Sequence, residues 1–168
     1  MSFPTGKETG TYLALDMGGT NLRVCEIYLP EEEGEFDITQ SKYRMPEELK
    51  TGTADELWEY IADCLQQFIE YHHEGERLNA LPLGFTFSYP ATQEYIDHGV
   101  LQRWTKGFDI DGVEGHDVVP PFEKAIADRV GENASENIAY TNADPGRSNQ
   151  TDRTDKRYNR NSNRLGLY

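Results

Sequence analysis

The chain has 168 residues, which is room for one domain with a substantial core and a tight fit for two. Its formal net charge of -14 argues against a nucleic-acid partner, because phosphate binding needs a basic face. The sequence has no stretch of about 18 consecutive apolar residues and no basic and then apolar leader, so we expect a cytosolic protein with no membrane span.

The beginning of the chain predicts three β-strands. Residues 12–15 form a short apolar run that is typical of a buried strand. Residues 22–29 and 36–43 resume strand patterns after turns rich in glycine or glutamate. Short connections of this kind join antiparallel neighbours, so we expect an antiparallel meander.

A helix is predicted to follow these strands. Thr53 and Glu56 have the spacing of a capping box, in which each side chain satisfies the backbone N–H of the other residue. Gly75 is a suitable residue to end the helix. The apolar residues between these signals recur at helical spacing on one face: they are Leu57, Ile61, Leu65, Phe68 and Ile69.

The middle of the chain predicts a fourth strand and a second helix. Residues 83–87 read as a buried strand, residues 88–114 as a long loop, and residues 119–129 as a helix with two prolines in its first turn. This helix should return the chain to a parallel strand, for which residues 137–140 are the candidate. The predicted fold class is therefore α/β, with three antiparallel strands followed by helix, strand and helix.

The last part of the chain differs in composition from the rest. Residues 133–168 contain six Lys or Arg against four Asp or Glu, whereas residues 1–132 are strongly acidic. Residues 141–164 include no Val, Ile, Leu, Met, Phe or Trp, so they cannot bury enough apolar surface to offset the entropy of ordering them. We expect one folded domain over residues 1–132 and an unrelated, disordered polar tail over residues 133–168.

The cysteines and histidines predict no metal site. Cys25 and Cys64 have no other Cys or His near them at the spacing of a zinc clip, and we expect both to be small buried residues in a reducing compartment. The four histidines show no pattern that suggests chemistry: they are His72, His73, His98 and His116.

The turn between the first two strands carries the densest group of candidate binding residues. They are Asp16, Gly18, Gly19, Thr20, Asn21 and Arg23. The glycines can adopt positive φ and bring backbone N–H groups close to a ligand, so the segment could cradle a polyphosphate. The carboxylate would then face the metal ion of that polyphosphate through water. An ordinary hairpin with a glycine turn explains the spacing equally well, and the Walker and dinucleotide spacings are absent.

Two groups of motifs resemble one known family. Residues 13–23 resemble the first phosphate motif of hexokinases and actin-like ATPases, and Asn21-Leu22-Arg23 is its hexokinase form. The hexokinase sugar-binding signature is matched by the segments Leu83-Gly-Phe-Thr-Phe-Ser-Tyr-Pro90, Ile96-Asp97 and Leu101-Gln-Arg-Trp-Thr-Lys-Gly-Phe108. Residues 4–8 and 112–118 agree as well. The resemblance covers roughly residues 1–129 and is closest to fungal hexokinases.

The resemblance implies ATP-dependent phosphorylation of glucose, fructose or mannose at the 6-hydroxyl. It also implies a ribonuclease H-like domain of the actin-like ATPase type, of which residues 1–132 would be the small domain. Ser88, Thr105 and Lys106 would hydrogen-bond the hexose. The turn residues would meet the phosphates of ATP, and Asp16 would face Mg2+ through water.

The sequence departs from the family after Arg129. Family members continue with a strand ending in Asn-Asp-Thr, whose aspartate takes the proton of the attacking hydroxyl; here Asp144, which lacks those neighbours, is the remaining candidate. The large domain of the family is not recognisable either, so we expect a truncated chain. The alternative interpretation is a catalytically inactive fragment, a sugar-binding, phosphate-binding or regulatory module that could associate with a complete hexokinase. Another sugar kinase is disfavoured by the unbroken Phe-Ser-Tyr-Pro and Trp-Thr-Lys motifs.

Overall fold

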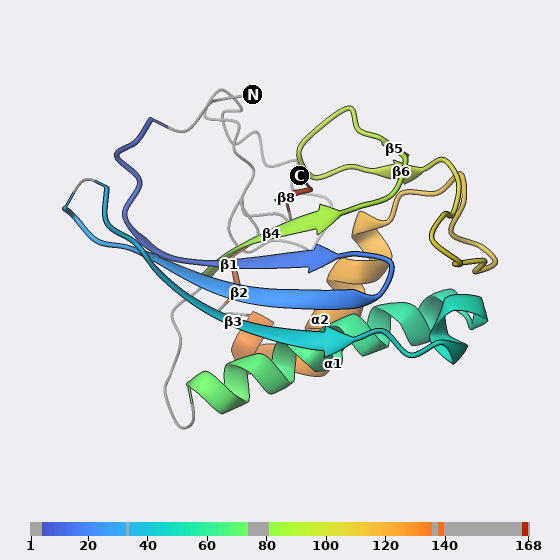
Figure 1. The fold of residues 1–168 in the computed structure, drawn as a ribbon, viewed down its shortest axis with the longest axis horizontal. Coiled ribbons are helices and arrows are strands. Elements are labelled where there is room, and N and C mark those ends of the chain that lie inside the picture. The colour runs from blue at the N-terminus through green and yellow to red at the C-terminus, as the bar shows by residue number, and fades with distance from the viewer. Residues whose placement is uncertain (1–4, 33, 74–80, 136–137, 140–165, 168) are drawn as a thin grey trace, which may run out of the picture.

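The structure is a computed structural model that describes residues 5–32, 34–73, 81–135, 138–139 and 166–167 (Figure 1). The main sheet has the strand order β3-β2-β1-β4-β7, and β8 also pairs with β4. The mixed α/β class is therefore confirmed. The strands are β1 Gly10–Met17, β2 Asn21–Leu29, β3 Asp37–Arg44, β4 Leu81–Phe87, β5 Ala91–Thr92, β6 Val100–Leu101, β7 Ile138–Ala139 and β8 Gly166–Leu167. The helices are η1 Glu48–Thr51, a 3-10 turn, α1 Ala54–His72 and α2 Val119–Ser135.

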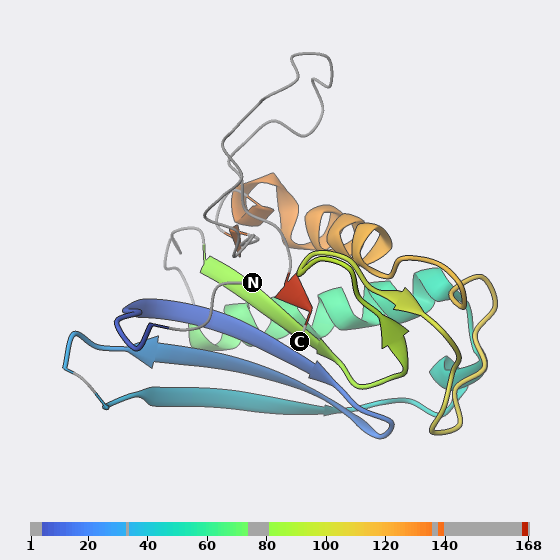
Figure 2. The same ribbon diagram turned by 90° about the horizontal axis from the view of Figure 1, so that it is seen from above.

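The first three strands form the predicted antiparallel meander. β1 pairs with β2, and β2 pairs with β3, both in antiparallel register. Successive side chains of a strand point to opposite faces of the sheet, and one face carries the buried set: Leu13, Leu15, Met17, Leu22 and Val24. Figure 2 shows that α1 and α2 both lie on one side of the sheet. The core therefore sits between that face and the two helices.

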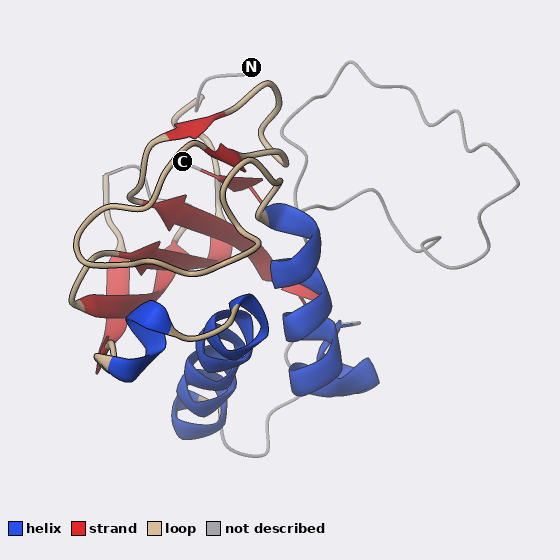
Figure 3. Cartoon of the chain, turned by 90° about the vertical axis from the view of Figure 1, so that its right-hand side faces the viewer, coloured by secondary structure: helices blue, strands red, loops and turns tan. Residues whose placement is uncertain are grey.

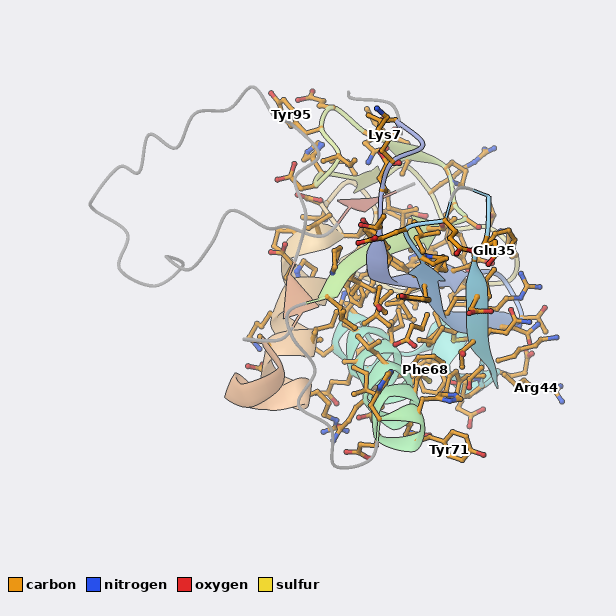
Figure 4. All side chains as sticks on the ribbon, turned by 90° about the vertical axis from the view of Figure 1, so that its left-hand side faces the viewer. Lys7, Glu35, Arg44, Phe68, Tyr71 and Tyr95 are labelled. Carbon is orange, nitrogen blue, oxygen red and sulfur yellow. The ribbon has the colours of Figure 1, made fainter. Side chains whose placement is uncertain are left out.

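The helix α1 begins and packs as its sequence predicts. The Thr53 hydroxyl accepts a hydrogen bond from the Glu56 amide at 3.3 Å, and the Glu56 carboxylate accepts one from the Thr53 amide at 2.7 Å. Phe68, on the apolar stripe, is fully buried, whereas Tyr71 is 83% exposed and points away from the sheet (Figure 4). The capping box is thus formed, and the helix faces the core with its apolar side.

The end of α1 is tied to the sheet. The helix ends at His72, and the His73 amide donates to the Ile69 carbonyl at 2.8 Å. A ring nitrogen of His73 lies 2.6 Å from a Glu26 carboxylate oxygen on β2, so one of the histidines has an acidic partner that the sequence pattern did not indicate. The predicted stop, Gly75, lies outside the described residues.

The strand β4 and the helix α2 complete the core. β4 runs parallel to β1, as expected for a strand that follows a crossover helix. Phe122 of α2 is fully buried, and its ring centroid lies 4.5 Å from that of Phe85 on β4. Arg129 forms an ion pair with Asp63 of α1. The helix continues to Ser135, beyond the predicted end at residue 129. None of the described helices is long and apolar enough to cross a membrane.

Two short segments lie beside β4 on the side away from β1. β7 pairs with the start of β4 in parallel, so a parallel strand follows α2 where one was expected. β8 pairs in parallel with the middle of β4. Within the expected disordered tail, residues 133–135 instead belong to α2, and the residues other than these, β7 and β8, Asp144 among them, lie outside the described residues. The domain boundary at residue 132 stays a prediction.

The segment predicted as a plain loop over residues 88–114 contains two short strands. β5 and β6 pair antiparallel, and each has two residues, which is too short for alternation to reveal in the sequence. Two carboxylates brace the segment: Glu114 accepts from the Trp104 amide at 2.5 Å, and Asp117 accepts from the amides of Gly99 and Val119 at 3.0 and 3.2 Å. Figure 3 looks at the ends of β1 and β4 and shows the loop in front of them.

Candidate functional site

The two groups of motifs meet where β1 and β4 end. The strands are parallel neighbours with Met17 opposite Phe87, so the turn after β1 and the loop after β4 leave the sheet side by side (Figure 1). The Ser88 amide donates to the Met17 carbonyl at 3.2 Å, which extends this pairing by one bond. Residues about 70 positions apart in the chain are thereby brought to one edge, as ligand sites at the carboxyl ends of parallel strands require.

Asp16 lies at the centre of this edge. Its carboxylate accepts from the Arg23 guanidinium at 3.0 Å, across the hairpin pair that β1 and β2 form. The Ser88 hydroxyl donates to the other carboxylate oxygen at 3.3 Å, which is long for an O–H···O bond and therefore a loose contact. The Asp16 side chain is 38% exposed, so solvent or a ligand can reach it. The predicted phosphate group and one predicted sugar residue are therefore in contact.

The turn between β1 and β2 is closed by backbone hydrogen bonds. The Gly18 amide donates to the Asn21 carbonyl at 3.0 Å, and the Thr20 carbonyl accepts from the Met45 amide at 2.9 Å. Gly18 and Gly19 do not use the positive φ that glycine allows, since neither is among the positive-φ residues of the described chain. The turn closes with ordinary backbone angles, so a different reason must account for the second glycine.

That reason is the close approach of Lys106 to Gly19. A Cβ placed on Gly19 would lie 2.7 Å from the Lys106 Cβ and 2.9 Å from its Cδ, which is closer than atoms tolerate. A Cβ on Gly18 would meet only the Asn21 carbonyl oxygen, at an ordinary 3.5 Å. Gly19 is therefore the contact point between the phosphate turn and the sugar loop.

Lys106 is held in a strained backbone conformation. Its φ is 59°, the left-handed region, and it is the one non-glycine residue with positive φ in the described chain. Such conformations cost about 1–3 kcal/mol and cluster at functional sites. The Lys106 ammonium donates to the Ser88 carbonyl at 2.5 Å and lies 4.9 Å from the centroid of the Tyr89 ring. The predicted sugar residues Ser88 and Lys106 are thus adjacent.

The rest of the sugar loop is anchored by aromatic packing. Trp104 and Phe108 are 8% and 5% exposed, and their rings stack with centroids 5.3 Å apart. Thr105 lies between them and is half-buried, and its carbonyl accepts from the Phe108 amide at 3.2 Å. The two buried rings therefore anchor this part of the loop in the core.

Tyr89 belongs to the site although its sequence position did not single it out. Its hydroxyl donates to the Gly18 carbonyl at 3.1 Å, and the residue is 7% exposed. Burial raises the pKa of the phenol well above its ordinary value, so the hydroxyl stays a donor. In the sequence, Tyr89 was marked only by its place in the Ser-Tyr-Pro motif, in which the serine and not the tyrosine was expected to bind the hexose.

The residues present fit a magnesium ion that is shared with phosphates. The described residues contain no group of three His, Cys, Asp or Glu side chains that could hold a metal by themselves. Mg2+ in nucleotide sites is commonly bound by one or two carboxylates together with phosphate oxygens and water. The partly exposed Asp16 carboxylate beside the turn meets that requirement.

An open hollow of about 440 Å³ lies at the opposite end of the sheet and contains none of the predicted site residues. Residues of the N-terminal segment and of the β2–β3 connection line it, among them Lys7 and Glu35 (Figure 4). The candidate site at the ends of β1 and β4 is identified by its converging polar groups and not by the volume of a cavity.

The cysteines carry no reactive site. Both are free thiols, and Cys64 is buried as predicted, whereas Cys25 on β2 is only half-buried. Burial raises the pKa of the Cys64 thiol to about 11 and raises that of Cys25 as well. Both therefore remain protonated at neutral pH and are poor nucleophiles.

The comparisons with known proteins agree on one family. A family model described as hexokinase matches residues 1–142. The hexokinase of Emericella nidulans is 78% identical over 129 residues, which are 77% of this chain and 26% of that protein. Hexokinase-2 of Saccharomyces cerevisiae is 55% identical over 130 residues, again 77% of this chain and 26% of the relative.

Solved structures give the same answer. A hexokinase from Schistosoma mansoni complexed with glucose superimposes with a TM-score of 0.70 at 40% identity, over 82% of this chain and 29% of that one. A second hexokinase crystal structure gives a TM-score of 0.66 at 36% identity, over 74% of this chain and 30% of that one. The chain thus spans about a quarter of the length of the curated relatives it matches.

Proposed function

The chain belongs to the hexokinase family, and we propose that its described residues form the phosphate turn and one wall of the hexose site of an ATP-dependent hexokinase. The reaction is transfer of the γ-phosphoryl group of ATP to the 6-hydroxyl of glucose, fructose or mannose. We infer for the domain a ribonuclease H-like topology of the actin-like ATPase type, which the antiparallel meander β1-β2-β3 followed by the parallel strand β4 supports. The Schistosoma mansoni hexokinase of similar fold is complexed with glucose, which supports a hexose as the ligand here.

The observation that carries the proposal is the contact between the two groups of motifs. Lys106 packs on Gly19 of the turn, and its ammonium reaches the Ser88 carbonyl. A sugar offers several hydroxyl groups, and a site discriminates among sugars through polar groups that the wrong sugar leaves unpaired. Ser88, Thr105 and Lys106 supply such groups within one short stretch of the edge.

The turn residues and Asp16 would serve the nucleotide. Backbone N–H groups, the Thr20 hydroxyl and the Asn21 amide would bind phosphate oxygens, and Arg23 would add a fixed cation. Asp16 would hold Mg2+, usually through water; the bound Mg2+ neutralises charge on the phosphates. Arg23 forms an ion pair with Asp16 in this structure. Binding of nucleotide and metal would break this pair, so that Arg23 would contact phosphate and Asp16 would face Mg2+.

Phosphoryl transfer also needs a base and a fixed position for both substrates. Asp16 is already engaged by Arg23 and Ser88, which leaves it poorly suited to accept the proton of the hexose hydroxyl. Asp144 lies outside the described residues. This favours a second candidate for the isolated 168 residues: a module that binds hexose or phosphate without turnover and that could associate with a complete hexokinase.

Calorimetric titration of the purified chain with glucose tests the sugar site. Lys106→Ala should lower glucose affinity at least about tenfold, because a charged hydrogen-bond donor contributes about 1.5–3 kcal/mol. The matched control is Lys124→Ala, since Lys124 is an exposed lysine of α2 paired with Asp128. Equal glucose affinity in the two variants would refute the assignment of the sugar site.

A chimera separates binding from catalysis. The 129 matching residues of the Emericella nidulans hexokinase would be replaced by those of this chain, and glucose-dependent ATP consumption would be measured beside the isolated chain. If the chimera is active and the isolated chain is inactive, the result would support the interpretation that the 168 residues alone form a binding module without turnover. Turnover by the isolated chain would require a base within it, and Asp144→Asn would then be the variant to assay, since loss of a base costs about 10² to 10⁴-fold.

A further inference from the structure

We propose that Tyr89 is a positioning residue that joins the phosphate turn to the sugar loop; this inference rests on the proposed function. Its hydroxyl donates to the Gly18 carbonyl at 3.1 Å, and its ring lies under the Lys106 ammonium at 4.9 Å. One side chain therefore contacts both halves of the site through two different groups.

The ring of Tyr89 is itself immobilised. It is 7% exposed and lies among three other aromatic rings, with centroid distances of 4.8 Å to Phe87, 5.0 Å to Trp104 and 5.4 Å to Phe108. Phe87 belongs to β4 and the other two belong to the sugar loop. Because packed interiors allow few alternative arrangements, the hydroxyl and the ring face keep fixed positions relative to the sheet.

The Tyr89 hydroxyl restrains the turn at the peptide group of Gly18. Gly18 contributes its amide to the bond that closes the turn and its carbonyl to Tyr89. A glycine has more backbone freedom than any other residue, so a hydrogen bond to the Gly18 carbonyl restricts a part of the turn that could otherwise adopt many conformations. The Tyr89 hydroxyl thereby holds the turn amides in place for phosphate oxygens.

The ring face acts on Lys106. An ammonium above an aromatic ring is attracted to the ring's negative face, most strongly where water is excluded. Lys106 also bears a left-handed φ of 59°, which needs support from surrounding contacts. The Tyr89 ring, the Ser88 carbonyl and the Gly19 surface supply three such contacts.

Two substitutions at Tyr89 separate these effects. Tyr89→Phe removes the hydroxyl and keeps the ring, so it should loosen the turn and leave Lys106 in place. Tyr89→Leu removes both and should affect turn and loop together. The matched control is Tyr12→Phe, because the Tyr12 hydroxyl also donates to a backbone carbonyl, that of Thr9, at the same 3.1 Å.

Hydrogen exchange of single amides in the full chain, followed by NMR, tests the restraint directly. In Tyr89→Phe the amides of Gly18 and Met45, which close the turn, should exchange about three- to tenfold faster, the range expected for loss of one neutral hydrogen bond. Amides in the middle of β1 and β2 should keep their rates, and Tyr12→Phe should leave the turn unchanged. Unchanged exchange at the turn, or equal acceleration throughout the sheet, would overturn the proposal.

Ligand titrations of the same variants test the functional half. Tyr89→Phe should weaken Mg-ATP binding about three- to tenfold and leave glucose binding unchanged, whereas Tyr89→Leu should weaken both. Faster exchange at the turn with unchanged Mg-ATP affinity would overturn the link to the nucleotide. If the unsubstituted chain binds neither ligand, the proposed function fails, while the exchange rates still decide whether Tyr89 restrains the turn.

Discussion

Replacing Gly19 by alanine should displace Lys106 and weaken hexose binding. The new Cβ would lie 2.7 Å from the Lys106 Cβ and 2.9 Å from its Cδ. The Cδ can rotate away, because it lies far along a flexible side chain. The Cβ cannot, since it is fixed to a backbone that is already held at a φ of 59°. The sugar loop itself must therefore move.

The size of the effect follows from the cost of overpacking. One extra methyl group in a packed contact costs about 1–3 kcal/mol. If that cost falls on the binding-competent position of Lys106, glucose affinity falls about 5- to 150-fold, since about 1.4 kcal/mol corresponds to a factor of ten. The thermal midpoint should also fall, by about 2–4 °C for each kcal/mol in a chain of this size.

Calorimetry and thermal unfolding of two matched variants decide the matter. Gly18→Ala is the control, because its Cβ meets the Asn21 carbonyl oxygen at an ordinary 3.5 Å and neither glycine has a positive φ. A second change, Lys106→Gly, removes the three atoms that lie nearest to the new methyl group, so the midpoint of Gly19→Ala should recover in the double variant. Equal glucose affinity for Gly18→Ala and Gly19→Ala would refute the reasoning.

Three further predictions concern the cap, the acid range and the turn. Thr53→Ala removes one partner of the capping box and should lower stability by about 1 kcal/mol, a thermal midpoint lower by about 2–4 °C, with glucose affinity unchanged. Hydrogen bonds from the amide and hydroxyl of Thr5 lower the pKa of Glu8 to about 2. Because the folded pKa lies below the unfolded value of about 4.3, the ordered N-terminal segment is favoured above that pH and lost as pH falls toward 2; carboxyl NMR titration of Thr5→Ala should show the pKa raised. Arg23→Ala should weaken Mg-ATP binding without altering glucose binding, and an unchanged nucleotide titration would remove Arg23 from the phosphate site.

Much of the fold could be predicted because its signals are local. The buried side chains of β1 alternate with partly exposed ones, and the apolar residues of α1 recur at helical spacing after Thr53 and Glu56. β5 and β6 could not be predicted, because two residues carry no periodicity and their pairing depends on contacts across the loop. The end of α2 was predicted at residue 129, but the helix passes through Gly131 and continues to Ser135, because a glycine permits a helix end without requiring one.

Candidate site residues could be named from the sequence, whereas their geometry could not. Asp16 was a candidate because of its residue type beside the glycine turn, whereas Ser88 and Lys106 were implied by the resemblance of their motifs to those of hexokinases. The φ of Gly18 and Gly19 could not be predicted, because glycine permits positive φ without requiring it, and neither residue adopts it here. Here the need for glycine at position 19 is steric and comes from a residue far away in the chain.

The two groups of motifs become one site only through the parallel pairing of β1 and β4. That pairing places Asp16 beside Thr86 and Met17 beside Phe87, so each strand delivers its following residues to the same edge. Taken alone, the first motif is compatible with an ordinary hairpin turn, and the second is compatible with a surface lysine. Once both leave the sheet together, Lys106 has room only because residue 19 lacks a side chain. The strain at Lys106 and the glycine at the turn are therefore two consequences of one close approach, and a substitution at either position should be felt by the ligand of the other.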